Sequence, residues 1–117
     1  FWLARLTPML ESCAKTIGYA YRAGAVIGFG TDSAPMSPQY DTGVEFRFRK
    51  EYCGMENLDI LLQATRNSAL IAGLPDVGEI KVGMKADLIL VAGDPAADLS
   101  AMYVPPVQVW KNGIARK

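Results

Sequence analysis

The stretch AGAVIGFGTDS, residues 23–33, decides the fold. Its centre, residues 25–29, is a short continuous apolar run. Such a run is typical of a strand buried on both faces, as in a parallel sheet with helices outside. The run closes on Gly-Thr-Asp-Ser, and Pro35 and Pro38 then predict an irregular loop. We therefore expect a buried strand whose carboxyl end leads directly to an acidic residue, Asp32.

A helical pattern precedes this strand. Apolar or small residues recur at alternating spacings of three and four, which is one face of an amphipathic helix: Leu3, Leu6, Leu10, Cys13, Ile17, Ala20 and Gly24. Thr7-Pro8 suits an N-cap followed by proline at the first helical position, so we expect the regular helix to begin there. Ala23-Gly24 is expected to end it.

Two further helices are expected after the loop. The first covers residues 42–52 and has mixed polarity. The second begins with Glu56 or Asn57 as its N-cap and is stopped by Gly73 and Pro75. Its apolar face is formed by Leu58, Leu61, Leu62, Thr65, Ala69 and Ala72.

The remaining sequence changes character to short strand-like runs. These runs cover residues 79–82, 87–91, 107–111 and 114–116, and glycines and prolines separate them. Asn112-Gly113 between the last two runs is a strong signal for a two-residue hairpin. The chain is thus expected to read helix–strand–helix–helix, followed by a small antiparallel β unit.

Composition excludes several classes of protein. Half of the 117 residues are apolar, and 12 basic residues balance 12 acidic ones. This balance argues against a nucleic-acid or anionic-membrane binder, and no apolar run approaches the ~20 residues that span a bilayer. We see no signal peptide, so we expect a cytoplasmic location.

Two absences suggest that this chain is part of a larger protein. There is no histidine, and the chain opens at Phe1-Trp2 without an initiator methionine, already inside an apolar pattern. The two cysteines, Cys13 and Cys53, have no metal or redox spacing, so we expect two reduced, buried thiols.

Asp32 is the sharpest candidate for chemistry. A carboxylate just after a parallel strand lies at the carboxyl edge of the sheet, where active sites of parallel α/β folds gather. It could ligate a metal, or move a proton from water to a leaving group. From position alone, a cap of the turn or of the next helix is the competing interpretation.

Several motifs, taken in order, resemble the amidohydrolase superfamily, in particular its prolidase-like and imidazolonepropionase-like branch. Residues 23–33 resemble that branch's final barrel strand with its GTD ending, and QATRNSA at residues 63–69 resembles its "AAT.N.A" helix. Residues 77–91, with Gly-Asp-Pro at 93–95, resemble its "G.I..G..ADLV..DG.P" tail. Residues 109–113 resemble its closing hairpin. Each motif is weak by itself, but their order and spacing together are specific.

The resemblance implies an α/β fold. Residues 1–76 would form the last helix–strand–helix portion of a (β/α)8 TIM-type barrel, and residues 77–117 the C-terminal strands of a small flanking β-sandwich domain. In that family the GTD aspartate binds the more buried metal and shuttles a proton, so both roles fall on Asp32. The other family ligands are an HxH pair, a modified lysine or a glutamate, and two further histidines. The histidines cannot be in this chain.

The function implied is that of a metal-dependent hydrolase acting on small amides or dipeptides, with zinc as the divalent metal and one or two ions in the intact enzyme. EFRFR at residues 45–49 resembles members that cleave dipeptides or N-acyl amino acids. The family's "HG" pair shortly after GTD is missing, which leaves open a deaminase or cyclic-amidase parent. A non-catalytic α+β interaction module is the alternative from another class.

By itself, the chain is expected to hydrolyse nothing and to bind no catalytic metal tightly, because tight sites use three or four protein ligands. Titration of the chain with zinc tests this. We also expect its exposed apolar faces to drive homo-oligomer formation or domain swapping.

Other charged residues have local interpretations. Asp87 opens a strand and is expected to pair or cap locally, and Asp94 is a turn residue ahead of Pro95. The side chains of Glu45, Arg47, Arg49 and Lys50 alternate in sign and are expected on a solvated helix face. A role for Arg47 or Arg49 in binding a substrate carboxylate is the alternative.

Overall fold

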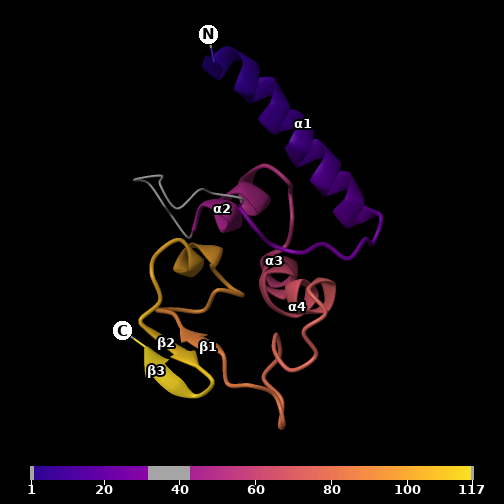
Figure 1. Cartoon of the computed structure of the whole chain (residues 1–117). Coiled ribbons are helices and arrows are strands. Elements are labelled where there is room, and N and C mark those ends of the chain that lie inside the picture. Colours follow the sequence, from indigo (N-terminus) through magenta and orange to yellow (C-terminus); the bar gives the residue numbers. More distant parts are fainter. Residues whose placement is uncertain (1, 32–42, 117) are drawn as a thin grey trace.

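The computed structural model describes residues 2–31 and 43–116, with side chains from residue 8 onward. It is a mixture of helices and a small sheet, with principal extents of 48 × 35 × 28 Å. One long helix reaches away from the rest, the shorter helices lie at the centre, and the sheet lies on the opposite side near the C-terminus (Figure 1). Among the described residues, no helix has the length and apolar character needed to cross a bilayer.

The long helix, α1, spans Trp2–Arg22 and contains Pro8. The expectation that the regular helix begins at Pro8 is therefore wrong. The apolar spacing already runs through Leu3 and Leu6, and this periodicity prevails over the local proline signal. The helix ends as expected, because Gly24 has a φ of 76° and the Ala25 amide donates to the carbonyl of Ala20 at 3.0 Å. This pair of features is the glycine-dependent Schellman end.

Residues 25–29, predicted as a strand buried on both faces, lie in an extended segment, residues 25–31, that has no strand partner in the described part of the chain. Val26 is 58% exposed, so burial on both faces is wrong for this structure. A strand is held by ladder hydrogen bonds, and the described residues offer none to this segment. Ile27 and Phe29 nevertheless pack against the core, so one side of the segment is covered.

The helices after residue 42 lie close to their predicted positions. Helix α2 spans Val44–Glu51. The next helix begins after Glu56, one of the two predicted N-caps, as α3, Asn57–Leu62. It continues through a π-helical turn, η1, Gln63–Asn67, into α4, Ser68–Ile71. The π-helical turn has no counterpart in the sequence prediction.

The sheet has three antiparallel strands in the order β1-β2-β3. They are β1, Leu88–Leu90, β2, Gln108–Lys111, and β3, Ile114–Arg116, and the short 3-10 helix η2, Leu99–Met102, lies between β1 and β2. Asn112 and Gly113 have φ values of 53° and 76°, which two-residue hairpins of type I′ require. The predicted hairpin is confirmed.

Residues 79–82, predicted as a strand, form a loop instead. Ile80 and Val82 are 92% and 102% exposed. The loop is closed at its base, where the Lys85 amide donates to the Asp76 carbonyl at 2.8 Å and the two side chains form an ion pair at 2.6 Å. Contacts between Asp76 and Lys85 therefore hold this segment as a loop, without a neighbouring strand.

The core lies between α1, α2, α3 and η2. Its buried members come from all four elements and the turn between α2 and α3: Ala14, Phe46, Cys53, Met55, Ile60 and Leu99. The carboxyl end of the extended segment 25–31 joins this core through Phe29.

Candidate active site

Asp32, the predicted metal ligand and catalytic acid–base, lies outside the described residues. The described chain reaches Thr31, the residue immediately before it. What the structure shows of the candidate site is therefore how the backbone that leads to Asp32 is held, and how the chain is held again where its description resumes at Gly43.

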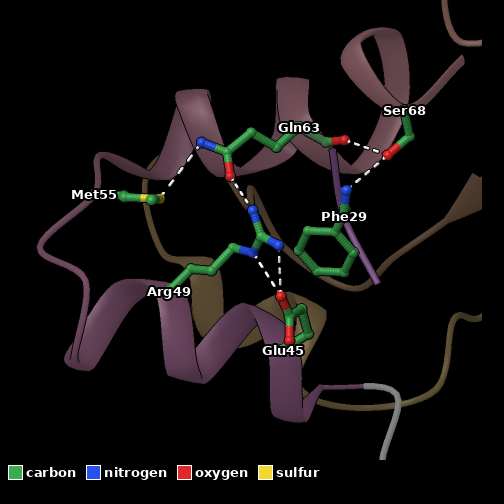
Figure 2. Close-up of polar contacts among 6 residues, drawn as sticks. All are labelled: Phe29, Glu45, Arg49, Met55, Gln63 and Ser68. Carbon is green, nitrogen blue, oxygen red and sulfur yellow. Dashed lines mark hydrogen bonds and ion pairs between the residues drawn. The ribbon is translucent and has the colours of Figure 1, made fainter. Parts of the chain in front are cut away.

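Phe29, three residues before Asp32, is held by three contacts, and Figure 2 shows the partners of two of them, Ser68 and Arg49. Its backbone amide donates to Oγ of Ser68 at 2.9 Å. Its ring lies 4.5 Å from the ring of Phe46, centroid to centroid, and the guanidinium of Arg49 lies 4.8 Å from the same ring. The segment is thereby attached to both α2 and the helix that contains η1.

Arg49 is buried at the centre of a polar network (Figure 2). Its Nε donates to Oε1 of Glu45 at 2.7 Å, and its Nη2 lies 2.6 Å from the same oxygen. Its Nη1 donates to Oε1 of Gln63, which is also buried. The Gln63 amide nitrogen then donates to Sδ of Met55 at 3.4 Å. This network joins α2 to η1 beneath the ring of Phe29.

The prediction of a solvated face for Glu45, Arg47, Arg49 and Lys50 is correct for Lys50 and wrong for Arg49. Arg49 lies three positions after the core residue Phe46, and therefore on the same side of α2. Its charge is balanced by Glu45 inside the molecule, which argues against its use on a substrate carboxylate. Arg47 is half-buried, with its guanidinium 4.9 Å from the ring of Tyr103.

At Gly43 the chain lies directly against the segment that follows η2. A Cβ at position 43 would meet the backbone of Tyr103, with its carbonyl oxygen and carbon at 2.7 and 2.8 Å. Only glycine permits this approach. Burial raises the pKa of the Tyr103 phenol, as expected for a ring covered by α2.

The described residues contain no group of three or more His, Cys, Asp or Glu side chains that could hold a metal ion. A carboxylate at position 32 has the right chemistry for one ligand of a divalent ion, but tight sites use three or four. The described residues together with a carboxylate at position 32 thus fit one position of a metal site rather than a whole site.

The two cysteines are free, as expected. Cys53 is buried, and this burial raises the pKa of its thiol. Cys13 is exposed, so the prediction of two buried thiols is wrong for it.

Asp87 and Asp94 have the local roles predicted for them. Asp87 pairs with Nζ of Lys111 and accepts the Asn112 amide at 2.8 Å, and these contacts, the Lys111 ammonium first, lower the pKa of its carboxyl. Asp94 accepts the Ala96 amide at 2.9 Å within its turn.

The described surface contains an apolar groove of about 500 Å³, lined in part by Val26, Leu70, Leu74 and Met84. Val26 stands at the amino end of the extended segment, six residues before Asp32 in the sequence. In the barrel that the resemblance implies, active sites lie at the carboxyl ends of the strands, so we do not expect this groove to be the candidate site.

The chain belongs to the amidohydrolase family, which residues 9–115 match. Ochratoxinase from Aspergillus niger is 34% identical over 114 residues, which is 94% of this chain and 23% of that enzyme. The crystal structure of the A. niger ochratoxinase is similar to the structure of this chain, with a TM-score of 0.81 and 33% identity. The match covers 96% of this chain and 26% of that one. The chain therefore spans about a quarter of the length of these relatives.

The resemblance to the prolidase and imidazolonepropionase branch is confirmed. A putative prolidase from Bifidobacterium longum matches with a TM-score of 0.76 and 33% identity, covering 91% of this chain and 26% of that one. Imidazolonepropionase from Deinococcus deserti is 31% identical over 94 residues, 78% of this chain and 24% of that enzyme. A 5-methylthioadenosine/S-adenosylhomocysteine deaminase from Pelotomaculum thermopropionicum is 42% identical over 78 residues, 60% of this chain and 18% of that enzyme.

Sequence reasoning missed Ser68 and the network of Arg49 with Gln63. A signal for each is present. A serine inside a helix is free to bond a preceding carbonyl, and Glu45 and Arg49 stand four residues apart, the spacing of a helical ion pair. The contact of Ser68 with Phe29 joins residues 39 apart in sequence, which no local pattern shows.

Proposed function

We propose that the protein to which this chain belongs is a metal-dependent hydrolase of amide or peptide-like C–N bonds, with dipeptides or N-acyl amino acids as its substrate class. Membership in the amidohydrolase family and the likeness to ochratoxinase and to a putative prolidase support this proposal. The observation that carries it is the anchoring of the segment that leads to Asp32 in the sequence. The core fixes this segment through Phe29, three residues before Asp32.

In this proposal, residues 1–76 are the last helix–strand–helix portion of a (β/α)8 barrel. The extended segment 25–31 between α1 and α3 is consistent with a barrel strand whose neighbours come from elsewhere in the protein. Residues 77–117 belong to a small β-sandwich that flanks the barrel. The antiparallel sheet of β1, β2 and β3 supports this division.

Asp32 is proposed as one ligand of a divalent metal, zinc, and as the acid–base of the reaction. The metal would polarise the substrate carbonyl and make a water more acidic. The Asp32 carboxylate would take a proton from the attacking water and deliver it to the leaving nitrogen as the C–N bond breaks. The products are a carboxylic acid and an amine.

A panel of dipeptides and N-acyl amino acids, offered to the complete enzyme before and after chelation, tests the proposal. We expect hydrolysis that chelation abolishes and zinc restores. This chain by itself should release no product, and zinc should not bind it stoichiometrically in a calorimetric titration. Absence of hydrolysis of every amide by the metal-loaded complete protein would count against the proposal and favour a non-catalytic module.

A second candidate is a deaminase. The identity to the deaminase from Pelotomaculum thermopropionicum favours it. The same chemistry then attacks a ring carbon and releases ammonia instead of an amine. Ammonia release from methylthioadenosine, with no cleavage of dipeptides, is the result that would decide for this candidate.

A further inference from the structure

We propose that Ser68 is a positioning residue for the reaction: its hydroxyl, set by the π-helical turn η1, holds the backbone that delivers Asp32. This inference rests on the proposed function, because it gives Ser68 a role only if Asp32 acts in the site. Ser68 itself touches neither substrate nor metal in this account. It acts through the amide of Phe29.

The Ser68 hydroxyl has both of its hydrogen-bonding directions in use. It donates to the carbonyl of Gln63, five residues earlier, at 2.7 Å, and it accepts the Phe29 amide at 2.9 Å. Because the hydroxyl proton is committed to Gln63, a lone pair is left facing Phe29. The contact is directional, and both bonds are drawn in Figure 2.

The π-helical turn creates this arrangement. Gln63–Asn67 is wound more widely than the α-helix on either side, and Ser68 begins the α-helix that follows. Single π-helical turns are rare and are often found at functional sites. Here the Gln63 carbonyl, at the start of the wide turn, accepts the Ser68 hydroxyl, and the side-chain oxygen of Gln63 also accepts a hydrogen bond from Arg49. Gln63 thus contacts both Ser68 and Arg49, the two residues that support Phe29.

Gly28 allows the extended segment to come close to Ser68. A Cβ at Gly28 would lie 3.0 Å from Cδ1 of Ile71 and 3.6 Å from Oγ of Ser68, so the absence of a side chain lets the backbone approach the helix. At Gly30 a Cβ would meet nothing within 4 Å. Phe29 is therefore held tightly, while the neighbouring Gly30 stands in open space.

The distance from this anchor to Asp32 is short. Consecutive Cα atoms are 3.8 Å apart, so Asp32 lies at most about 11 Å from Phe29 along the chain. Misplacing a catalytic group by 1 Å is enough to cost up to roughly a hundredfold in rate. An anchor three residues away can therefore set the rate without contacting the reacting atoms.

Amide hydrogen exchange of this chain, followed by NMR, tests the contact itself. Ser68→Ala should speed exchange of the Phe29 amide by roughly fivefold, which corresponds to one hydrogen bond. Thr65→Ala is the matched control, because it removes a hydroxyl from the same helix that bonds only the Leu61 carbonyl in the described contacts. Equal Phe29 exchange in Ser68→Ala and the control would overturn the inference.

Kinetics of the complete enzyme test the role. Ser68→Ala should lower kcat by roughly ten- to a hundredfold and leave KM nearly unchanged. Ser68→Thr, which keeps the hydroxyl, should recover most of kcat, and Thr65→Ala should match the wild type. An unchanged kcat in Ser68→Ala, or a folded Ser68→Thr as slow as Ser68→Ala, contradicts the role.

Gly28→Ala is the second variant if Ser68→Ala fails to fold. It crowds the same contact and leaves the hydroxyl in place, so it should lower kcat in the same direction, and a normal kcat would contradict the role. Failure of the proposed function has a different appearance: the wild-type enzyme hydrolyses nothing, while the faster Phe29 exchange in Ser68→Ala persists.

Discussion

Arg49 shows how a charged residue becomes part of the interior. Its side chain is 5% exposed, and its partner Glu45 is 12% exposed. The guanidinium also covers the ring of Phe29. The pair is therefore a structural link between α2, the extended segment and η1, rather than a surface ion pair of little energetic weight.

Removing Arg49 should be costly. Arg49→Met leaves the Glu45 carboxylate and the side-chain Oε1 of Gln63 without their partner. Breaking such a buried pair costs about 3 kcal/mol of unfolding free energy. Lys50→Met, on the exposed side of the same helix, should change it by less than about 0.5 kcal/mol. Urea unfolding of both variants measures the difference, and equal stabilities would show that Arg49 is solvated after all.

Asp87 gives the hairpin a pH dependence with a defined sign. Its folded-state pKa lies below the ordinary value of 3.8, because Lys111 and the Asn112 amide favour the charged carboxylate. A lowered pKa stabilises the fold above the unfolded-state pKa, and this stabilisation is lost as pH falls through the folded-state pKa.

Asp87→Asn should therefore lower the melting temperature at pH 7, and its difference from the wild type should shrink below pH 3.8. Lys111→Met is the matched variant. This variant removes the largest cause of the lowered Asp87 pKa, so the stability of Lys111→Met should depend less on pH in this acidic range than that of the wild type. Thermal melting followed by circular dichroism at several pH values measures both effects. If the difference in melting temperature between Asp87→Asn and the wild type grew as the pH fell, the lowered pKa of Asp87 would be contradicted.

At the scale of elements, local patterns predicted much of the fold. The 3.6-residue periodicity gave the helices, and Asn112-Gly113 gave the hairpin with its two positive φ values. Periodicity does not report partners, however. The apolar run at 25–29 looks like a buried strand whether or not neighbouring strands are present, and residues 79–82 carry a strand-like pattern although they close on themselves as a loop.

The candidate site was predictable only in part for the same reason. The ordered motifs single out Asp32, which stays a prediction, because the described residues stop one position before it. The supports of Phe29 come from α2, η1 and α4, and such contacts depend on how elements pack. A sequence pattern read along one element contains no information on that packing.

The junction between α2 and the segment after η2 depends on Gly43. Gly43→Ala would force a Cβ into the backbone of Tyr103, which has no flexible end to move aside, so we expect a loss of about 1–3 kcal/mol. Gly30→Ala is the control, since its Cβ meets nothing within 4 Å. Chemical unfolding compares the two variants, and a Gly43→Ala protein as stable as Gly30→Ala would show that the two segments are not in contact.

At the scale of the whole molecule, the chain presents many apolar side chains to solvent. Val26, Leu70, Ile71 and Leu74 are each more than half exposed. Relatives about four times as long have further chain available to cover the matching surfaces. Exposed apolar area of this kind favours association.

By itself, the chain should therefore self-associate. Sedimentation velocity at increasing protein concentration is expected to show a rising average sedimentation coefficient. Leu70→Ser combined with Leu74→Ser should weaken the effect, because both changes fall on the exposed apolar surface. A concentration-independent monomer would contradict this expectation.

Asp32 is proposed as a metal ligand and as the proton-transfer group of an amide hydrolase. Asp32→Asn in the complete enzyme tests this role most directly, with Asp94→Asn, at a turn residue, as the matched control. We expect Asp32→Asn to lose bound metal and its kcat to fall by about 10²–10⁴, the usual contribution of acid–base catalysis, while Asp94→Asn retains both. A folded Asp32→Asn enzyme with wild-type metal content and turnover would contradict it.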